Sequence, residues 1–331
     1  MSSESLGSGT GLVPIIDFEP FLTGSNKQAV ADEILKSLKA VGFVQLINHG
    51  VPQEKVDEMF RWSKSFFSLP LETKQLAPHP PSGTHHRGYS APGREKVLQH
   101  VYDKEKVEAM RLNVPDVKES FEVGREDDKI MPNIWLPDGV LPGFKQACLD
   151  FYWTCDITKF RILGALALGL GLDENYFESS HKVGDNQLRL LHYPSLPEQS
   201  LKNGEAARIG QHSDFGSITM LFQDAVGGLE VEDPNNPGEF KAVPSVENAL
   251  VVNAGDFLMR WSNDLIRSTI HRVQAPPGSS KDGATPERYS IPYDFDTVVE
   301  CLPGTYSDVR PKRYEPISAS EYILQRLAAT Y

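Results

Sequence analysis

The second half of the chain, from about Leu188 to Tyr293, consists of short apolar runs separated by Gly, Pro, Asn and Asp. Apolar runs of this length between turn-forming residues are typical of β-strands. Many short strands at even spacing bury their apolar faces by closing into a barrel or by packing as two facing sheets. We therefore predict a jelly roll here, with strands at residues 188–193, 218–223, 228–231, 249–253, 269–274 and 288–293.

The first half has mainly helical patterns. Val30, Ile34 and Leu38 recur at helical spacing, and Ser25 or Asn26 is suited to cap this helix. A short strand is predicted at 42–48, a second helix at 56–67, ended by Pro70, and a third at about 141–170. The chain is thus expected to have an α+β fold, in which helices buttress a double-stranded β-helix (jelly-roll, cupin-like) core.

The sequence indicates one domain over residues 13–331, with an N-terminal helical and β region at 13–135 and the jelly-roll core at 180–300. Residues 1–12 are Ser/Gly-rich, without the features of a signal peptide, and are predicted to be a disordered tail. Residues 318–331 are expected to form a final amphipathic helix. Residues 77–94 resemble a long lid-like loop, in which His79, His85 and His86 should be solvated.

Composition excludes several classes of partner. The formal net charge of −12 disfavours a nucleic-acid backbone as ligand. No apolar run approaches the roughly 20 residues that span a bilayer. The three cysteines form no paired framework, which favours a reducing, cytoplasmic location. Nothing indicates an obligate protein partner, so a small molecule is the expected substrate.

The sequence around His212 carries the strongest chemical signal. His212 and Asp214 are one residue apart, so on a strand both side chains point to the same face. A third ligand must come from another strand, and His271, 57 positions past Asp214 (271 − 214), is the best candidate. Two imidazoles and one carboxylate leave three positions of an octahedral ion open, which suits non-haem Fe(II). The alternative is that both histidines are ordinary polar core residues.

A second pair of residues follows this set. Arg288 and Ser290 lie one strand past His271 and share a strand face by the same period of two. A guanidinium and a neighbouring hydroxyl together donate the hydrogen bonds that a distal carboxylate accepts. Taken alone, such a pair is usually part of a surface strand.

Together these motifs resemble the isopenicillin N synthase-like superfamily of 2-oxoglutarate/Fe(II)-dependent dioxygenases. The resemblance rests on the ordered motifs at residues 42–51, 212–214, 253–256, 261–263, 271–273 and 288–290. Within the superfamily the chain is most similar to a fungal subgroup related to thymine 7-hydroxylase, through residues 87–95, 118–126, 184–194 and 327–331.

The resemblance implies a role for each motif residue. His212, Asp214 and His271 would bind Fe(2+), and Arg288 and Ser290 would hold the distal carboxylate of the co-substrate 2-oxoglutarate. Tyr193 would add a hydroxyl donor to that carboxylate, and O2 would be the oxidant. Plant relatives often carry Asn where this chain has Leu191, so one polar contact to the co-substrate differs.

The substrate site is expected to include Asn186 and Arg189, which match positions that contact the pyrimidine in thymine hydroxylase, together with Phe215 and Trp261. An amide and a guanidinium suit an imide or carboxamide edge. Alternatively, Arg189 forms a buried ion pair, Asn186 is a turn residue and Trp261 packs in the core. The aromatic residue that stacks on the base is replaced by Asp294 or lost, which disfavours thymine itself.

The predicted activity is hydroxylation, desaturation or cyclisation of a small organic substrate. The expected substrate is a nitrogen heterocycle such as a nucleobase, a nicotinate-type catabolite or a fungal secondary metabolite. Three alternatives remain open at this point: an oxidase of the same superfamily that needs no 2-oxoglutarate, a hydrolytic zinc enzyme, and a metal-free scaffold or binding protein.

Overall fold

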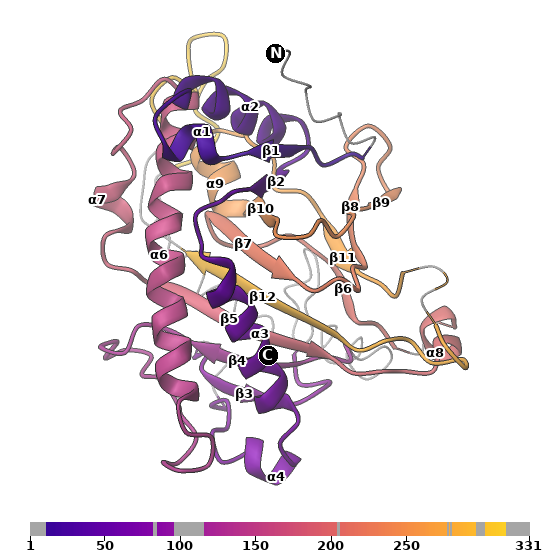
Figure 1. Ribbon diagram of the computed structural model, residues 1–331. Coiled ribbons are helices and arrows are strands. Elements are labelled where there is room, and N and C mark those ends of the chain that lie inside the picture. The colour runs from indigo at the N-terminus through magenta and orange to yellow at the C-terminus, as the bar shows by residue number, and fades with distance from the viewer. Residues whose placement is uncertain are drawn as a thin grey trace, which may run out of the picture.

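A computed structural model describes residues 11–81, 85–95, 116–203, 206–276, 278, 280–295 and 302–315. Two β-sheets form its core (Figure 1). The larger sheet has the strand order β1-β2-β10-β7-β12-β5-β4-β3, and the smaller has the order β6-β11-β8-β9. The strands are β1 (Ile15–Asp17), β2 (Phe43–Ile47), β3 (Gly88–Ser90), β4 (Glu119–Val123), β5 (Asn186–Tyr193), β6 (Ile209–His212), β7 (Ile218–Gln223), β8 (Leu229–Glu232), β9 (Phe240–Ala242), β10 (Leu250–Ala254), β11 (His271–Val273) and β12 (Arg288–Phe295).

Helices cover one side of the larger sheet. The long helix α6 runs along this side, and α2 and α3 pack against α6 (Figure 1). The helices are α1 (Glu19–Leu22), α2 (Lys27–Ala40), α3 (Gln53–Phe67), α4 (Leu71–Lys74), α6 (Phe144–Gly169), α7 (Glu178–His181), α8 (Glu198–Lys202) and α9 (Asp256–Trp261). The predicted α+β fold with a jelly-roll core is confirmed.

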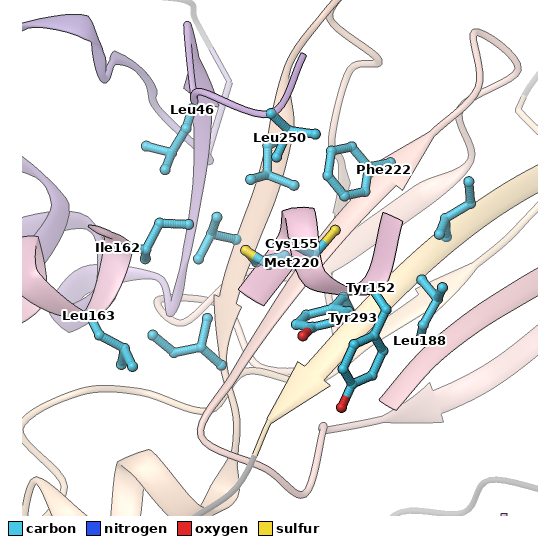
Figure 2. Close-up of a cluster of buried hydrophobic side chains, with 14 of the residues drawn as sticks. Leu46, Tyr152, Cys155, Ile162, Leu163, Leu188, Met220, Phe222, Leu250 and Tyr293 are labelled. Carbon is cyan, nitrogen blue, oxygen red and sulfur yellow. The ribbon is translucent and has the colours of Figure 1, made fainter. Parts of the chain in front are cut away.

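The larger sheet has one apolar and one polar face because side chains alternate along each strand. Leu188 of β5, Met220 and Phe222 of β7 and Tyr293 of β12 pack in the core with Tyr152 and other residues of α6 (Figure 2). The residues between them, such as Arg189, Thr219 and Ser290, face the opposite side, toward the space between the sheets. The helix side therefore holds the core together, and the opposite side carries the polar side chains.

Most predicted elements lie close to their predicted positions. The strand predicted at 218–223 coincides with β7, and the three predicted helices correspond to α2, α3 and α6. Strand β3 falls inside the predicted loop 77–94, where it pairs with β4. Residues 1–10 of the predicted tail and the helix predicted at 318–331 lie outside the described residues. Within the described part of the chain, no helix combines the length and the apolarity needed to cross a membrane.

Candidate active site

The structure brings His212, Asp214 and His271 together at the end of the smaller sheet. His212 is the last residue of β6, His271 is the first of β11, and the two are register partners in the antiparallel pair. Asp214 Oδ1 lies 3.8 Å from His212 Nε2 and 3.5 Å from His271 Nε2. The three potential ligand atoms all lie within 4.8 Å of one another.

Backbone carbonyl groups orient both imidazoles. His212 Nδ1 lies 2.9 Å from the Gly210 carbonyl oxygen, and His271 Nδ1 lies 3.1 Å from that of Thr269. Because a carbonyl only accepts, each Nδ1 carries the proton and donates it, which leaves a lone pair on each Nε2. Metal-binding histidines are commonly held in this way. Both lone pairs therefore lie on the Asp214 side.

Two polar side chains of the larger sheet orient Asp214. Its Oδ2 accepts hydrogen bonds from Thr219 Oγ1 at 2.5 Å and from Asn253 Nδ2 at 2.7 Å. Thr219 and Asn253 are register partners on β7 and β10, so both point to the same side of the sheet. With Oδ2 committed, Oδ1 faces the two imidazoles.

The prediction that Asp214 lies on a strand beside His212 is wrong. Strand β6 ends at His212, and Asp214 lies in the loop that leads to β7. Backbone contacts with the junction of β10 and α9 fix its position, since Asp256 N donates to Asp214 O at 2.8 Å and Gly255 N donates to Ser217 O at 3.0 Å. The spacing brought the two ligands together through a turn, not through strand alternation.

The electrostatics of the triad favour a neutral imidazole at His212 and a charged carboxylate at Asp214. Burial, with His271 close by, lowers the pKa of His212 from 6.5 to about 3. Burial opposes ionisation of Asp214, but the two histidines and the hydrogen bonds from Thr219 and Asn253 outweigh it and lower the pKa of Asp214. Neutral imidazole and ionised carboxylate are the states that bind a metal ion.

The three residues that were predicted to hold a carboxylate also lie together. Arg288 is fully buried on β12, donates from Nη1 to Ser290 Oγ at 3.0 Å and lies 5.0 Å from the centroid of the Tyr193 ring. Its remaining bonds go to neutral acceptors, from Nε to the Gly227 carbonyl oxygen and from Nη2 to Gln223 Oε1. The three predicted clamp residues thus meet because β5 and β12 pair with Arg288 opposite Tyr193.

Arg189 lies on the same side of the larger sheet, within a buried charged network. It donates to Glu95 Oε2 at 2.8 Å and to Glu122 Oε1 at 2.9 Å. Lys118 also pairs with Glu95. The alternative that Arg189 forms a buried ion pair is therefore correct, and its role in substrate binding stays a prediction.

Two predicted substrate residues lie elsewhere. Asn186 is three positions before Arg189 and therefore on the opposite, helix-facing side of β5, where its Nδ2 donates to Asp156 Oδ1 and Tyr293 Oη. Trp261 is buried against Phe177 in the core, so the packing alternative holds. Phe215 follows Asp214 in the loop and is partly buried, and its role stays a prediction.

The histidines of the 77–94 segment also differ from expectation. His79 and His86 are buried, with ring nitrogens 3.9 Å and 3.8 Å from Glu122 Oε2, so these two are not solvated. Burial lowers the pKa of His86 to about 4. The strand β3 that follows draws this segment onto β4, which carries Glu122.

Three polar residues of the larger sheet lie beside the triad in an arrangement that the sequence did not predict. Thr219, Asn253 and Asp294 form one row of register partners across β10, β7 and β12. Burial, followed by the proximity of Asp214, raises the pKa of Asp294 to about 7. The row depends on strand register, which no local pattern in the sequence reveals.

The donor set fits a divalent first-row transition metal. Two imidazole nitrogens and one carboxylate oxygen converge with their other polar atoms already bonded, and nitrogen and oxygen ligands on one side suit Fe(II). The two described cysteines are buried in α6 with no pairing. Among the described residues, the triad therefore has no sulfur ligand of the kind that would favour a structural zinc.

Comparisons with known proteins agree with this geometry. Residues 13–138 match the N-terminal family model of the non-haem dioxygenase in morphine synthesis, and residues 184–297 match that of the 2OG-Fe(II) oxygenase superfamily. Proline hydroxylase buaE of Petromyces alliaceus is 39% identical over 96% of this chain and 98% of its own. The crystal structure of full-length Neurospora crassa thymine 7-hydroxylase with alpha-KG and thymine is 42% identical, with a TM-score of 0.87 over 99% of this chain and 100% of its own.

Proposed function

The chain belongs to the 2OG-Fe(II) oxygenase superfamily, and from this premise we propose that it oxidises a small nitrogen heterocycle at the site built around His212, Asp214 and His271. It is a 2-oxoglutarate-dependent dioxygenase, an oxidoreductase that uses Fe(II), 2-oxoglutarate and O2. The convergence of the three ligand atoms within 4.8 Å is the observation that carries the site assignment.

In this proposal the triad holds Fe(II), and Arg288, Ser290 and Tyr193 hold the distal carboxylate of 2-oxoglutarate. When bound, the two supply the oxidative chemistry: one oxygen atom of O2 enters succinate, which is released with CO2, and the other is delivered to the substrate. The protein contributes orientation. The carbonyls at Gly210 and Thr269 fix the imidazoles, and Thr219 and Asn253 fix Asp214.

The substrate class follows from the relatives and from Asp294. Proline and thymine, named for two similar proteins, are both small nitrogen-containing rings. A flat base is usually held by aromatic stacking. Here the row of register partners Asn253, Thr219 and Asp294 ends in the carboxyl group of Asp294. A carboxyl group accepts a hydrogen bond from a ring N–H without requiring a flat partner. We therefore favour a saturated ring, and we expect Arg189 to border its site.

We also propose that residues 13–331 act as one catalytic domain whose site comes from residues 180–300. A cytoplasmic location is consistent with the two described cysteines, Cys148 and Cys155, which are buried and unpaired.

The proposal is tested by succinate release and product mass with Fe(II), O2 and a panel of proline, pipecolate, thymine and nicotinate, with and without 2-oxoglutarate. Asp214→Ala should reduce release at least about 1000-fold, since a ligand to the ion is lost. Asp127→Ala, at a carboxylate with a side chain 81% exposed, is the matched control. Unchanged release by Asp214→Ala would refute the site, and turnover without 2-oxoglutarate would favour the oxidase alternative.

A further inference from the structure

A second arginine, Arg208, lies near Arg288 and outside the motifs at residues 212–214 and 288–290. It immediately precedes β6, four residues before His212, and its Nη2 contacts Pro286, two residues before Arg288. The side chain is fully buried. Nη2 donates to the Pro286 carbonyl oxygen, but Nε and Nη1 are buried without a hydrogen-bond partner in the described part of the chain.

Arg208 and Arg288 are close enough to affect each other. Burial and the charge of Arg288 lower the pKa of Arg208. Neither guanidinium has a carboxylate within 4.0 Å among the described residues, and the hydrogen bonds of Arg288 all go to neutral groups. The carboxylate that acts on both at longer range is Asp224, whose oxygens already accept from Val226 N and Tyr289 N.

Two buried cations that repel each other, one of them Arg208 with unpaired N–H groups, are unfavourable on their own. Burial of a charge costs free energy unless an opposite charge and hydrogen bonds compensate it, and like charges add to the cost. An anion placed between the two guanidinium groups would remove both penalties. The arrangement is therefore built for a negatively charged ligand.

We propose that Arg208 and Arg288 form one anion cradle in which Arg208 donates a second set of hydrogen bonds to the distal carboxylate of 2-oxoglutarate. The inference rests on the proposed role of Arg288. A carboxylate has two oxygen atoms with about four acceptor positions, so it accommodates two guanidinium groups and the hydroxyl groups of Ser290 and Tyr193. Arg208 then adds to the preference that Arg288 gives for a dicarboxylate over a keto acid with an apolar end.

The test is calorimetric binding to the anaerobic Fe(II) enzyme of two keto acids of equal length. 2-Oxoglutarate has the distal carboxylate, and 2-oxopentanoate has a methyl group in its place. Arg208→Met should weaken 2-oxoglutarate about 10- to 100-fold, as expected for a lost charge-assisted hydrogen bond, and change 2-oxopentanoate by less than about 3-fold. Arg208→Lys, which keeps the charge but not the fork, should give an intermediate preference.

Two further variants separate the possible failures. Arg61→Met, on the exposed side of α3, is the control and should leave both affinities unchanged. Arg288→Met should remove most of the preference for 2-oxoglutarate; if it does not, the clamp in the proposed function is wrong. A different outcome refutes only the role of Arg208. In that outcome Arg288→Met removes the preference, but Arg208→Met leaves 2-oxoglutarate binding unchanged or weakens the binding of both keto acids equally. Should Arg208→Met not fold, Arg208→Lys decides by the same ratio of affinities.

Discussion

His212 and His271 are direct partners across the β6–β11 pair, with 4.2 Å between the centroids of their rings. Two strands of the smaller sheet thus supply both imidazoles, and the larger sheet supplies the groups that orient the carboxylate. The proposed metal site is therefore a junction between the two sheets. Substitutions on either sheet should therefore change the affinity for Fe(II).

Thr219→Val tests this dependence on the larger sheet. Valine has nearly the same shape as threonine but donates no hydrogen bond, so Asp214 loses the 2.5 Å bond to its Oδ2. Losses of such supporting contacts typically weaken metal binding about 10- to 100-fold. Anaerobic titration with Fe(II) measures the change, and Thr23→Val, at an exposed position after α1, is the control. Equal affinities for Thr219→Val and the native protein would contradict the orienting role.

Gly255→Ala tests the close approach between the β10–α9 junction and the loop that holds Asp214. A Cβ at this position would lie 2.3 Å from the Gly216 carbonyl oxygen and 3.0 Å from that of Asp214, so the backbone has to move. We expect a loss of at least about 2 kcal/mol of stability, together with weaker Fe(II) binding. Gly238→Ala is the contrast: it has a φ of +88° and nothing within 4 Å of its Cβ. That change should cost about 1 kcal/mol of backbone strain and leave the metal affinity intact.

The fold was largely predictable because its signals are local. Runs of apolar residues between turn formers located β5, β7, β8, β10, β11 and β12 to within two residues at most of their bounds. Strand β6, which carries His212, was not separately predicted as a strand because Ile209 is its single strongly apolar residue. Strand β3 was missed because its sequence, Gly88–Ser90, has no apolar run and gains its place by pairing with β4.

The site was less predictable, for reasons of register. His212, Asp214 and His271 were found by spacing and by resemblance, although Asp214 reaches the site from a loop. Asn186 was misplaced because a separation of three from Arg189 puts the two residues on opposite sides of a strand. Arg208 was missed because its significance depends on Arg288, 80 residues later (288 − 208), and on strand pairing that the sequence does not display.

Arg189→Met tests the buried charged network beside the site. Removing the guanidinium leaves the carboxylates of Glu95 and Glu122, with side chains 7% and 0% exposed, short of a partner. Loss of one member of a buried ion pair costs about 3–5 kcal/mol, so urea unfolding should show a decrease of this order. Adding Glu122→Gln should restore part of the loss, because the uncompensated charge is then removed. Arg125→Met, in a surface pair, should cost less than about 1 kcal/mol, and a similar small cost for Arg189→Met would contradict the prediction.

His49→Asn tests how a buried neutral imidazole makes stability depend on pH. His49 is 4% exposed, packs on Phe222 and accepts a hydrogen bond at Nδ1 from Val51 N. Burial lowers the pKa of His49 from 6.5 to about 4. Above pH 6.5 the imidazole is neutral in both states, so it adds no pH dependence. As the pH falls from 6.5 toward 4, only the unfolded chain takes up the proton, and the folded state loses stability.

The variant should therefore lose less stability than the native protein on acidification. Asn keeps an acceptor near Nδ1 but does not titrate, so the difference in unfolding free energy between native protein and variant should shift by about 2 kcal/mol in favour of the variant between pH 7 and pH 5. Urea unfolding at a series of pH values measures this shift. Some acid sensitivity should remain, because burial also lowers the pKa values of His86 and His181 to about 4. A free-energy difference that stays constant from pH 7 to pH 5 would mean that His49 takes up its proton equally in the folded and unfolded states.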